Sequence, residues 1–174
     1  MTDDHRPSPP AVADERTMLA AWLDWHRATL EMKCAGLTPA QLATRAAEPS
    51  TLSLLGLVRH MADVERGWFR RGLAGEDAPP LYYSDADPDG DFDNVDPAAI
   101  DAETVDATFA TWRAECARAR EIVASLPSLD MLFTHRSGSQ MSARWVLVHM
   151  VEEYARHNGH ADLLRERIDG VTGE

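Results

Sequence analysis

Residues 142–168 read SARWVLVHMVEEYARHNGHADLLRERI, and this stretch decides the fold. Ser142 is a favourable N-cap, and no proline or glycine interrupts the run before Gly159, so the sequence predicts one long helix. Apolar side chains recur in steps that keep one face of this helix toward a core. They are Val146, Met150, Ala161, Leu164 and Ile168. The opposite face, which we expect to be exposed to solvent, carries Glu152, Asn158, Asp162, Arg165 and Glu166.

Two polar residues, Glu153 and His157, occupy the apolar face in the middle of this helix. They lie one turn apart, close enough for both side chains to contact one object. Such groups need a partner when buried, because an unpaired buried charge is costly. His149 and His160 lie within about 80° of the pair around the helix axis. The pair is therefore either a satisfied polar layer of the core or part of a site that another helix completes.

Three further amphipathic stretches predict helices at residues 14–35, 53–72 and 103–126. Their apolar residues are spaced in steps of three and four, close to the 3.5-residue repeat of packed helices. A short turn of helix is expected after Pro39, and an irregular or extended connection at residues 129–141. Together the four long helices predict an all-α fold, an antiparallel four-helix bundle with up-down-up-down or one-crossover topology.

The length of 174 residues and the hydrophobic content of 44% are sufficient for one domain with its own core. We expect this domain to span residues 14–170, after a disordered tail at residues 1–13. No apolar run is long enough to cross a bilayer, and the N-terminus is polar and rich in proline, so a cytoplasmic protein is expected. Cys34 and Cys116 lie far apart without C-x-x-C spacing, which favours two buried thiols over a disulfide.

The net charge of −12 argues against nucleic acid or an anionic membrane as a partner. No glycine-rich phosphate loop supports a nucleotide-binding fold. Residues 76–103 contain ten acidic residues and no lysine or arginine. Within them, residues 85–96 fit the calcium-loop template D-x-D-x-D-G, but prolines stand where its two flanking helices should be. An acidic surface loop, acting as a lid or an interface arm, is therefore favoured over a calcium site.

His60 is the best candidate to complete a site with the pair on the last helix, because it lies at the inward edge of the second helix. Helix bundles build metal sites from side chains that project inward from facing helices. His60, Glu153 and His157 would form a two-histidine, one-carboxylate set with open positions, which suits catalytic zinc. Non-haem iron uses the same set, and nickel is compatible with it. His26 and His135 are the other histidines near the predicted core.

Two segments of the chain resemble the DinB-like superfamily, and more narrowly its mini-circle-protein branch. They are LVRHMADVERGWFRR at residues 57–71 and HMVEEYARHNGHADLLRERIDG at residues 149–170. The similarity extends over nearly the whole chain after residue 14. It implies a four-helix bundle, often dimeric, that holds a divalent metal through one histidine of the second helix and two residues of the last. By position, these implied ligands are His60, Glu153 and His157.

The chain departs from the commonest pattern of the superfamily at two positions. Many relatives have histidine where this chain has Glu153, although the mycothiol-dependent maleylpyruvate isomerase relatives also have glutamate there. The resemblance therefore implies a changed metal preference at Glu153 rather than a lost site. His160 stands where many relatives have glutamine, and we expect it beside the ligands or facing a substrate.

The resemblance implies a thiol-dependent enzyme, since superfamily members include S-transferases that use mycothiol or bacillithiol and the isomerase. We expect a homodimer with a divalent metal, zinc before nickel or iron, whose activated thiolate attacks a small electrophile. His149 and His160 are the candidates for proton transfer, with His135 as a further choice. The alternatives are a hydrolase using metal-activated water, a non-catalytic stress-related bundle with a structural metal, and a polar core layer without metal.

Overall fold

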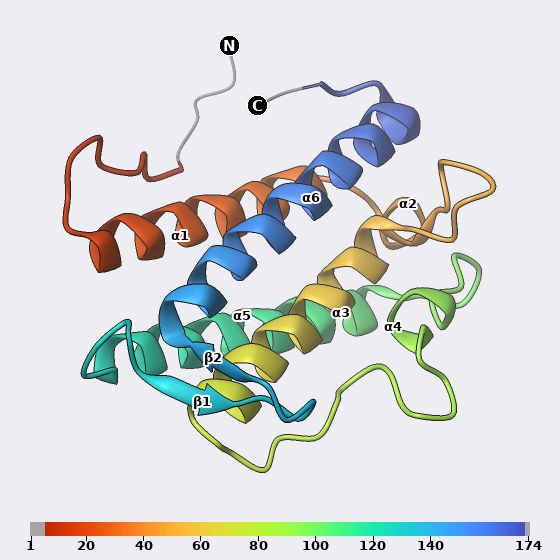
Figure 1. The fold of residues 1–174 in the computed structure, drawn as a ribbon. Coiled ribbons are helices and arrows are strands. Elements are labelled where there is room, and N and C mark those ends of the chain that lie inside the picture. Colours follow the sequence, from red (N-terminus) through yellow and green to blue (C-terminus); the bar gives the residue numbers. More distant parts are fainter. Residues whose placement is uncertain (1–5, 173–174) are drawn as a thin grey trace.

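The structure, a computed structural model, describes residues 6–172 and is mostly helical (Figure 1). Its four long helices are α1 (Glu15–Cys34), α3 (Leu54–Glu65), α5 (Ala102–Ser125) and α6 (Ala143–Asp169). The shorter elements are α2 (Pro39–Ala43), the π-helix η1 (Arg66–Leu73), α4 (Gly90–Asp93) and the strands β1 (Leu132–Thr134) and β2 (Gln140–Ser142). The all-α class is confirmed, because the strands of the described chain form only one small hairpin.

Polar side chains cap the long helices at their N-termini. Asp14, Ser53, Asp101 and Ser142 each accept a hydrogen bond from a backbone N–H in the first turn of the following helix. Each cap satisfies one of the N–H groups that a helix leaves without an internal partner. α6 ends at Gly170, whose φ of 76° is a left-handed conformation that glycine adopts without steric cost. Local sequence therefore sets both ends of the longest helix.

The long helices pack in two pairs around one core. α1 packs on α6 and α3 packs on α5, while contacts of α3 with α1 and α6 join the pairs (Figure 1). Each helix contributes fully buried side chains, among them Leu30, Met61, Trp112 and Met150. These residues lie at or next to the positions expected from the apolar spacing. The antiparallel four-helix-bundle arrangement stays a prediction.

The second long helix was expected to end at Arg71 or Gly72, and the chain is helical up to Leu73, but its last part is not α-helical. α3 ends at Glu65, and the chain continues as the π-helix η1 from Arg66 to Leu73. π-helical turns are rare and frequently lie at functional sites. A π-helix of 8 residues is too short to leave its own periodicity in the sequence, so the apolar spacing indicated only a helix.

The acidic stretch at residues 76–103 forms a loop that returns to α3 (Figure 1). Asp63 of α3 accepts hydrogen bonds from the backbone N–H groups of Leu81 and Tyr82. Residues 74–89 contain no helix, so the first of the two helices that flank a calcium loop is not formed. The favoured reading of this stretch as an acidic surface loop agrees with the structure.

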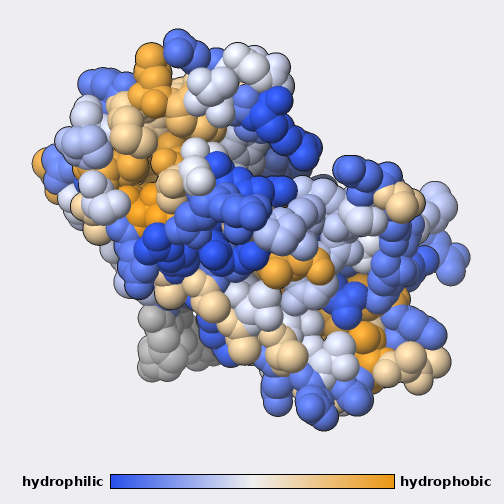
Figure 2. Space-filling view, turned by 90° about the horizontal axis from the view of Figure 1, so that it is seen from below, coloured by the Kyte–Doolittle hydropathy of each residue, from blue (hydrophilic) through white to orange (hydrophobic). Residues whose placement is uncertain are grey.

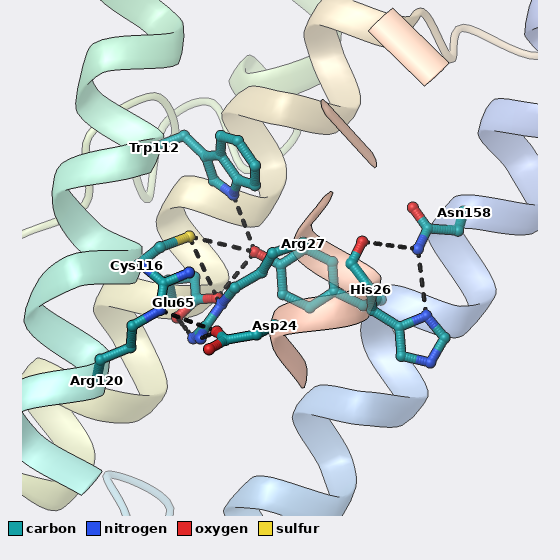
Figure 3. A network of polar contacts seen from close by, with 9 residues as sticks. Asp24, His26, Arg27, Glu65, Trp112, Cys116, Arg120 and Asn158 are labelled. Carbon is teal, nitrogen blue, oxygen red and sulfur yellow. Dashed lines mark hydrogen bonds and ion pairs between the residues drawn. The ribbon is translucent and has the colours of Figure 1, made fainter. Parts of the chain in front are cut away.

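A buried polar network joins all four long helices (Figure 3). Arg27 of α1 donates two hydrogen bonds of 2.7 Å to the carboxylate of Glu65 on α3. Tyr154 of α6 donates to the same carboxylate at 2.8 Å and accepts a hydrogen bond of 2.9 Å from the indole of Trp112 on α5. Burial alone would lower the pKa of Arg27, but Glu65 more than offsets this and the pKa lies well above its usual value. The ion pair between Arg27 and Glu65 is therefore satisfied within the core.

The predicted exposure of Asn158 and Arg165 is wrong. Asn158 is only 6% exposed, and its Nδ2 donates to the carbonyl of His26 at 3.0 Å. Arg165 is half-buried and donates to the carbonyls of Lys33 and Ala35 at the end of α1. α1 lies along this part of α6, so it covers a side of the helix that periodicity alone assigned to solvent.

Residues 1–5 of the predicted tail lie outside the described residues. Residues 6–13 form no helix or strand, and Arg6 donates a hydrogen bond to Thr29 of α1. Within residues 6–172, no helix has the length and apolar character needed to span a membrane. On the face shown in Figure 2, a hydrophilic region separates patches of hydrophobic residues.

Candidate metal centre

The structure brings the three candidate ligands together between α3 and α6. One donor atom from each of His60, Glu153 and His157 lies within 4.8 Å of the other two. The rings of His60 and His157 meet edge-on, with centroids 4.7 Å apart. Bonds from zinc to nitrogen or oxygen are about 2.0–2.2 Å long, so small side-chain rotations would bring these three donors to one ion.

The acidic loop holds the ring of His60 in place. Its Nδ1 lies 2.8 Å from Oδ2 of Asp91, a residue that is only 4% exposed. The ring also stacks on Phe92, with centroids 4.9 Å apart. An ionised carboxylate only accepts hydrogen bonds, so Nδ1 carries the proton and the lone pair of Nε2 is left available. A carboxylate behind the imidazole is a common support of metal-binding histidines.

His157 is supported by a residue of its own helix. Its Nδ1 lies 3.3 Å from Nδ1 of His160, and its Nε2 lies 3.4 Å from Oε2 of Glu153. Burial is the largest influence on His160 and lowers its pKa, so His160 is neutral at neutral pH and can accept a hydrogen bond from His157 Nδ1 or donate one to it. When Nδ1 carries the proton, the lone pair of His157 Nε2 is available to a metal; when Nε2 carries it, that N–H points at Glu153. His160 thus lies beside the candidate ligands.

Glu153 lies between two histidines of its own helix. Nε2 of His149 is 3.3 Å from one carboxylate oxygen and Nε2 of His157 is 3.4 Å from the other, longer than a usual hydrogen bond. The contact with His157 is the largest influence on Glu153 and lowers the pKa of its carboxyl, against the opposing effect of burial. Glu153 is therefore ionised at neutral pH, which is the form that binds metal.

A second group of donors shares Glu153. His149, Glu152 and Glu153 also offer donor atoms within 4.8 Å of one another. All three belong to α6, however, and Glu152 is exposed to solvent. Exposed acidic groups on one helix are common without a metal, whereas the set that includes His60 draws on two helices and is more buried. We therefore take the two-helix set as the candidate centre.

A cavity of about 380 Å³ opens beside the candidate centre, and His60 lies in its wall. The remaining wall comes from α3, η1, the acidic loop and the β1–β2 hairpin. Charged and aromatic residues in this wall include Asp63, Trp68, Arg71, Tyr83, His135 and Arg136. Because the cavity and the candidate centre share His60, a molecule in the cavity would lie next to the metal.

The other residues considered from the sequence lie away from the three ligands. His135 stacks on Trp68 at the cavity wall, with ring centroids 5.2 Å apart. His26 of α1 contacts Asn158 instead of the candidate centre. Both cysteines are buried and free, as predicted. Burial raises the pKa of Cys34 to about 12, so this thiol is not the nucleophile of a site.

Sequence reasoning missed Asp91 and the cavity. Asp91 stands in a run of alternating aspartates, and nothing local distinguishes it from Asp89 or Asp93. Its contact with His60 depends on the path of the loop, because the two residues are 31 positions apart. The calcium-like pattern was the only signal at this place, and it pointed to a different kind of site.

The fold and the donor set define a helical protein with a candidate site for a divalent metal between two core helices. A family model described as Mycothiol-S-transferase matches residues 18–170. The chain therefore belongs to the mycothiol-S-transferase family, within the DinB-like superfamily, and the predicted relation is confirmed. A comparison with curated proteins gives no match.

Proposed function

We propose that this protein is a metal-dependent mycothiol S-transferase in which His60, Glu153 and His157 hold the metal. The observation that carries the proposal is the convergence of these donors from two helices, in a chain of this family. Both imidazoles are also supported at Nδ1, which favours metal binding through Nε2. Two nitrogen donors and a carboxylate suit zinc, with iron or nickel as alternatives, and leave a coordination position for a substrate.

When bound, a divalent metal supplies positive charge that favours the thiolate form of a thiol beside it. The residues around the ligands fix the geometry, since Asp91 holds His60 and His160 contacts His157. We assign the acceptance of the thiol proton to His149. This side chain is 22% exposed and lies 3.3 Å from Glu153, so it can pass the proton to solvent. The sulfur then attacks a small electrophile.

Elemental analysis of the purified, untagged protein tests the ligand set. We expect about one zinc, iron or nickel ion per chain in the wild type, lost in His60→Ala and His157→Ala and weakened in Glu153→Gln. Glu152→Gln is the matched control at the neighbouring position, and His26→Ala is the control for removal of a histidine. Full metal content in the His60 and His157 variants would show that the ligand assignment is wrong.

Activity is tested by following the loss of mycothiol in the presence of an electrophile. We expect conjugation by the metal-loaded protein, and none by the metal-free protein. His149→Gln should lower kcat while metal content stays unchanged. If substrate is consumed without added thiol, the protein is a hydrolase rather than a transferase. If mycothiol is regenerated while the electrophile is rearranged, it is an isomerase.

The non-catalytic alternative is tested by the stability of the metal-free protein. The network of Arg27, Glu65 and Tyr154 and the apolar core do not include the candidate ligands. Chelation should therefore abolish activity, lower Tm modestly and leave far-ultraviolet circular dichroism unchanged. Unfolding of the metal-free protein at 25 °C would favour a structural metal.

We further propose the antiparallel four-helix-bundle topology and the homodimer that family membership supports. Sedimentation velocity measures the mass in solution and distinguishes a dimer from the 19.3 kDa monomer. A monomer at all concentrations would remove the dimer from the proposal and leave the metal centre unaffected.

A further inference from the structure

Two arginines that line the cavity beside His60, Arg71 and Arg136, form no ion pair with a carboxylate of the described chain. Of the three arginines of η1, Arg66 and Arg70 turn to α5, where they bind Glu115 at 2.6 and 3.1 Å. Arg71 instead lines the cavity, and its Nη2 contacts the hydroxyl of Tyr83 at 3.1 Å. Arg136, in the turn of the hairpin, lines the cavity too. Its side chain is exposed, and within residues 6–172 it makes no hydrogen bond or ion pair.

The two carboxylates in the cavity wall are already engaged. Asp63 accepts from two backbone N–H groups of the acidic loop, at 2.7 and 2.9 Å. Asp91 binds Nδ1 of His60. Neither forms an ion pair with Arg71 or Arg136 in the described chain. Burial raises the pKa of Asp63 and the charge of Arg71 opposes this rise, so these two groups interact without a direct contact. The two guanidinium groups are therefore available to a ligand, in a protein whose net charge of −12 makes such a site unusual.

The position of Arg71 depends on a glycine of the π-helix. A Cβ atom at Gly67 would lie 2.8 Å from Nη2 of Arg71, so the glycine leaves the space in which this guanidinium lies. Gly67 and Gly72 both line the cavity, so no side chain projects into it from these two positions of η1. Trp68 and Tyr83 add aromatic surface beside it. A cavity of about 380 Å³ is within the range of sites for small molecules.

We propose that this cavity binds an aromatic carboxylate as the electrophilic co-substrate. Arg71 and Arg136 would bind its carboxylate, because arginine forms charge-assisted and often bidentate hydrogen bonds with this group. Trp68 and Tyr83 would contact its ring, and the reacting carbon would face His60. The proposal rests on the proposed transferase function and adds the class of the second substrate to it.

The test compares two electrophiles of similar size and shape, the anion 4-chloro-3-nitrobenzoate and the neutral 4-chloro-3-nitrobenzamide, each variant being compared with the wild type on the same compound. In either reaction the thiolate sulfur bonds to the ring carbon that carries chlorine, chloride leaves with the bonding electron pair, and the thiol proton passes to a base. We expect Arg71→Gln and Arg136→Gln to lower kcat/KM about tenfold or more for the benzoate, since each removes a charged hydrogen bond. For the benzamide, kcat/KM of the two variants should differ from that of the wild type by less than about twofold. Arg113→Gln, an exposed arginine of α5, is the control.

A second readout does not depend on turnover. Titration of 4-chloro-3-nitrobenzoate into the metal-free protein without thiol should quench tryptophan fluorescence, because Trp68 lines the cavity, and Arg136→Gln should weaken this binding. Equal losses of kcat/KM for both electrophiles in the two variants would overturn the proposal. If neither is conjugated but the benzoate binds through Arg136, the transferase function fails while the carboxylate site stands.

Discussion

Asp91 connects the acidic loop to the candidate metal centre through a single side chain. Its carboxylate is buried and lies 2.8 Å from Nδ1 of His60. Such a contact fixes the tautomer and the ring orientation of a metal-binding histidine and increases its basicity. The loop therefore acts on the centre although it supplies none of the three candidate ligands.

We predict that Asp91→Asn weakens metal binding by about 10- to 100-fold, because the amide cannot orient and polarise His60 as a carboxylate does. Competition with a chromogenic zinc chelator measures this change. Asp93→Asn, an exposed aspartate two residues away, should bind metal like the wild type. Equal affinities for the Asp91 variant and the wild type would show that the contact does not support a ligand.

Glu65 holds the polar network together at the residue scale. It receives hydrogen bonds from Arg27 and Tyr154, and its side chain is buried. Removal of one partner of a buried ion pair leaves a charge without compensation. Glu65→Ala should therefore reduce the free energy of unfolding by about 3–5 kcal/mol, measured by urea denaturation at pH 7.

The matched control is Glu31→Ala, which removes an exposed glutamate that pairs with Arg113. Exposed ion pairs contribute about 0–1 kcal/mol, so this variant should remain close to the wild type. The double variant Arg27→Met, Glu65→Leu should recover much of the lost stability, since it leaves no unpaired charge. A loss in Glu65→Ala no larger than in Glu31→Ala would contradict this account of the network.

At the scale of elements, the acidic loop and η1 shape the cavity together. Asp63 binds the start of the loop through Leu81 and Tyr82, and Arg59 binds it near its end through the carbonyl of Asn94. The loop is thereby held against the helix that carries His60. Three of its residues, Tyr83, Pro88 and Asp91, line the cavity.

We predict that Asp63→Asn loosens this loop, because an asparagine side chain has one acceptor oxygen in place of two. Hydrogen exchange of the peptide that contains Leu81 and Tyr82 should become faster, while exchange in α1 stays unchanged. Asp77→Asn, an exposed aspartate near the start of the loop, is the control. Unchanged exchange at Leu81 and Tyr82 would mean that other contacts hold the loop.

At the scale of the whole molecule, we expect the stability of the metal-free protein to fall as the pH falls below about 6.5. Burial lowers the pKa of His26 in the folded state. The unfolded chain therefore binds more protons than the folded chain in this range. The contribution of neutral His26 to stability is present above pH 6.5 and is lost as the pH falls through the pKa of His26 in the folded state. Urea denaturation between pH 8 and pH 5 measures the slope, which should be smaller in His26→Gln.

We expect a second decrease in the stability of the folded protein at more acidic pH. Hydrogen bonds that Thr17 donates lower the pKa of Asp14, and those that Thr104 donates lower the pKa of Asp101. These carboxylates contribute stability above their unfolded pKa of about 3.9, and the contribution is lost as the pH falls through the lower folded values. Thr104→Val should reduce this acid-dependent part. If stability rises on acidification from pH 7 to pH 5, the assignment to His26 is wrong.

The sequence by itself determined the long helices and the pair at their centre. Caps such as Ser142, apolar steps of three and four and the one-turn spacing of Glu153 and His157 are local properties, fixed by the geometry of a helix. The position of His60 beside the apolar face of its helix likewise indicated that this side chain faces inward. Resemblance to a family then added the expectation that these residues bind metal together.

Only the tertiary structure decided what surrounds them. Asp91 reaches His60 because a long loop returns to α3. Asn158 is buried because α1 covers that side of α6. Arg71 faces the cavity because a π-helix follows α3. Each of these depends on contacts between residues far apart in the chain or on one irregular turn. Side-chain periodicity reports which face of a helix is apolar, but the partner that covers a face is chosen by packing of the whole chain.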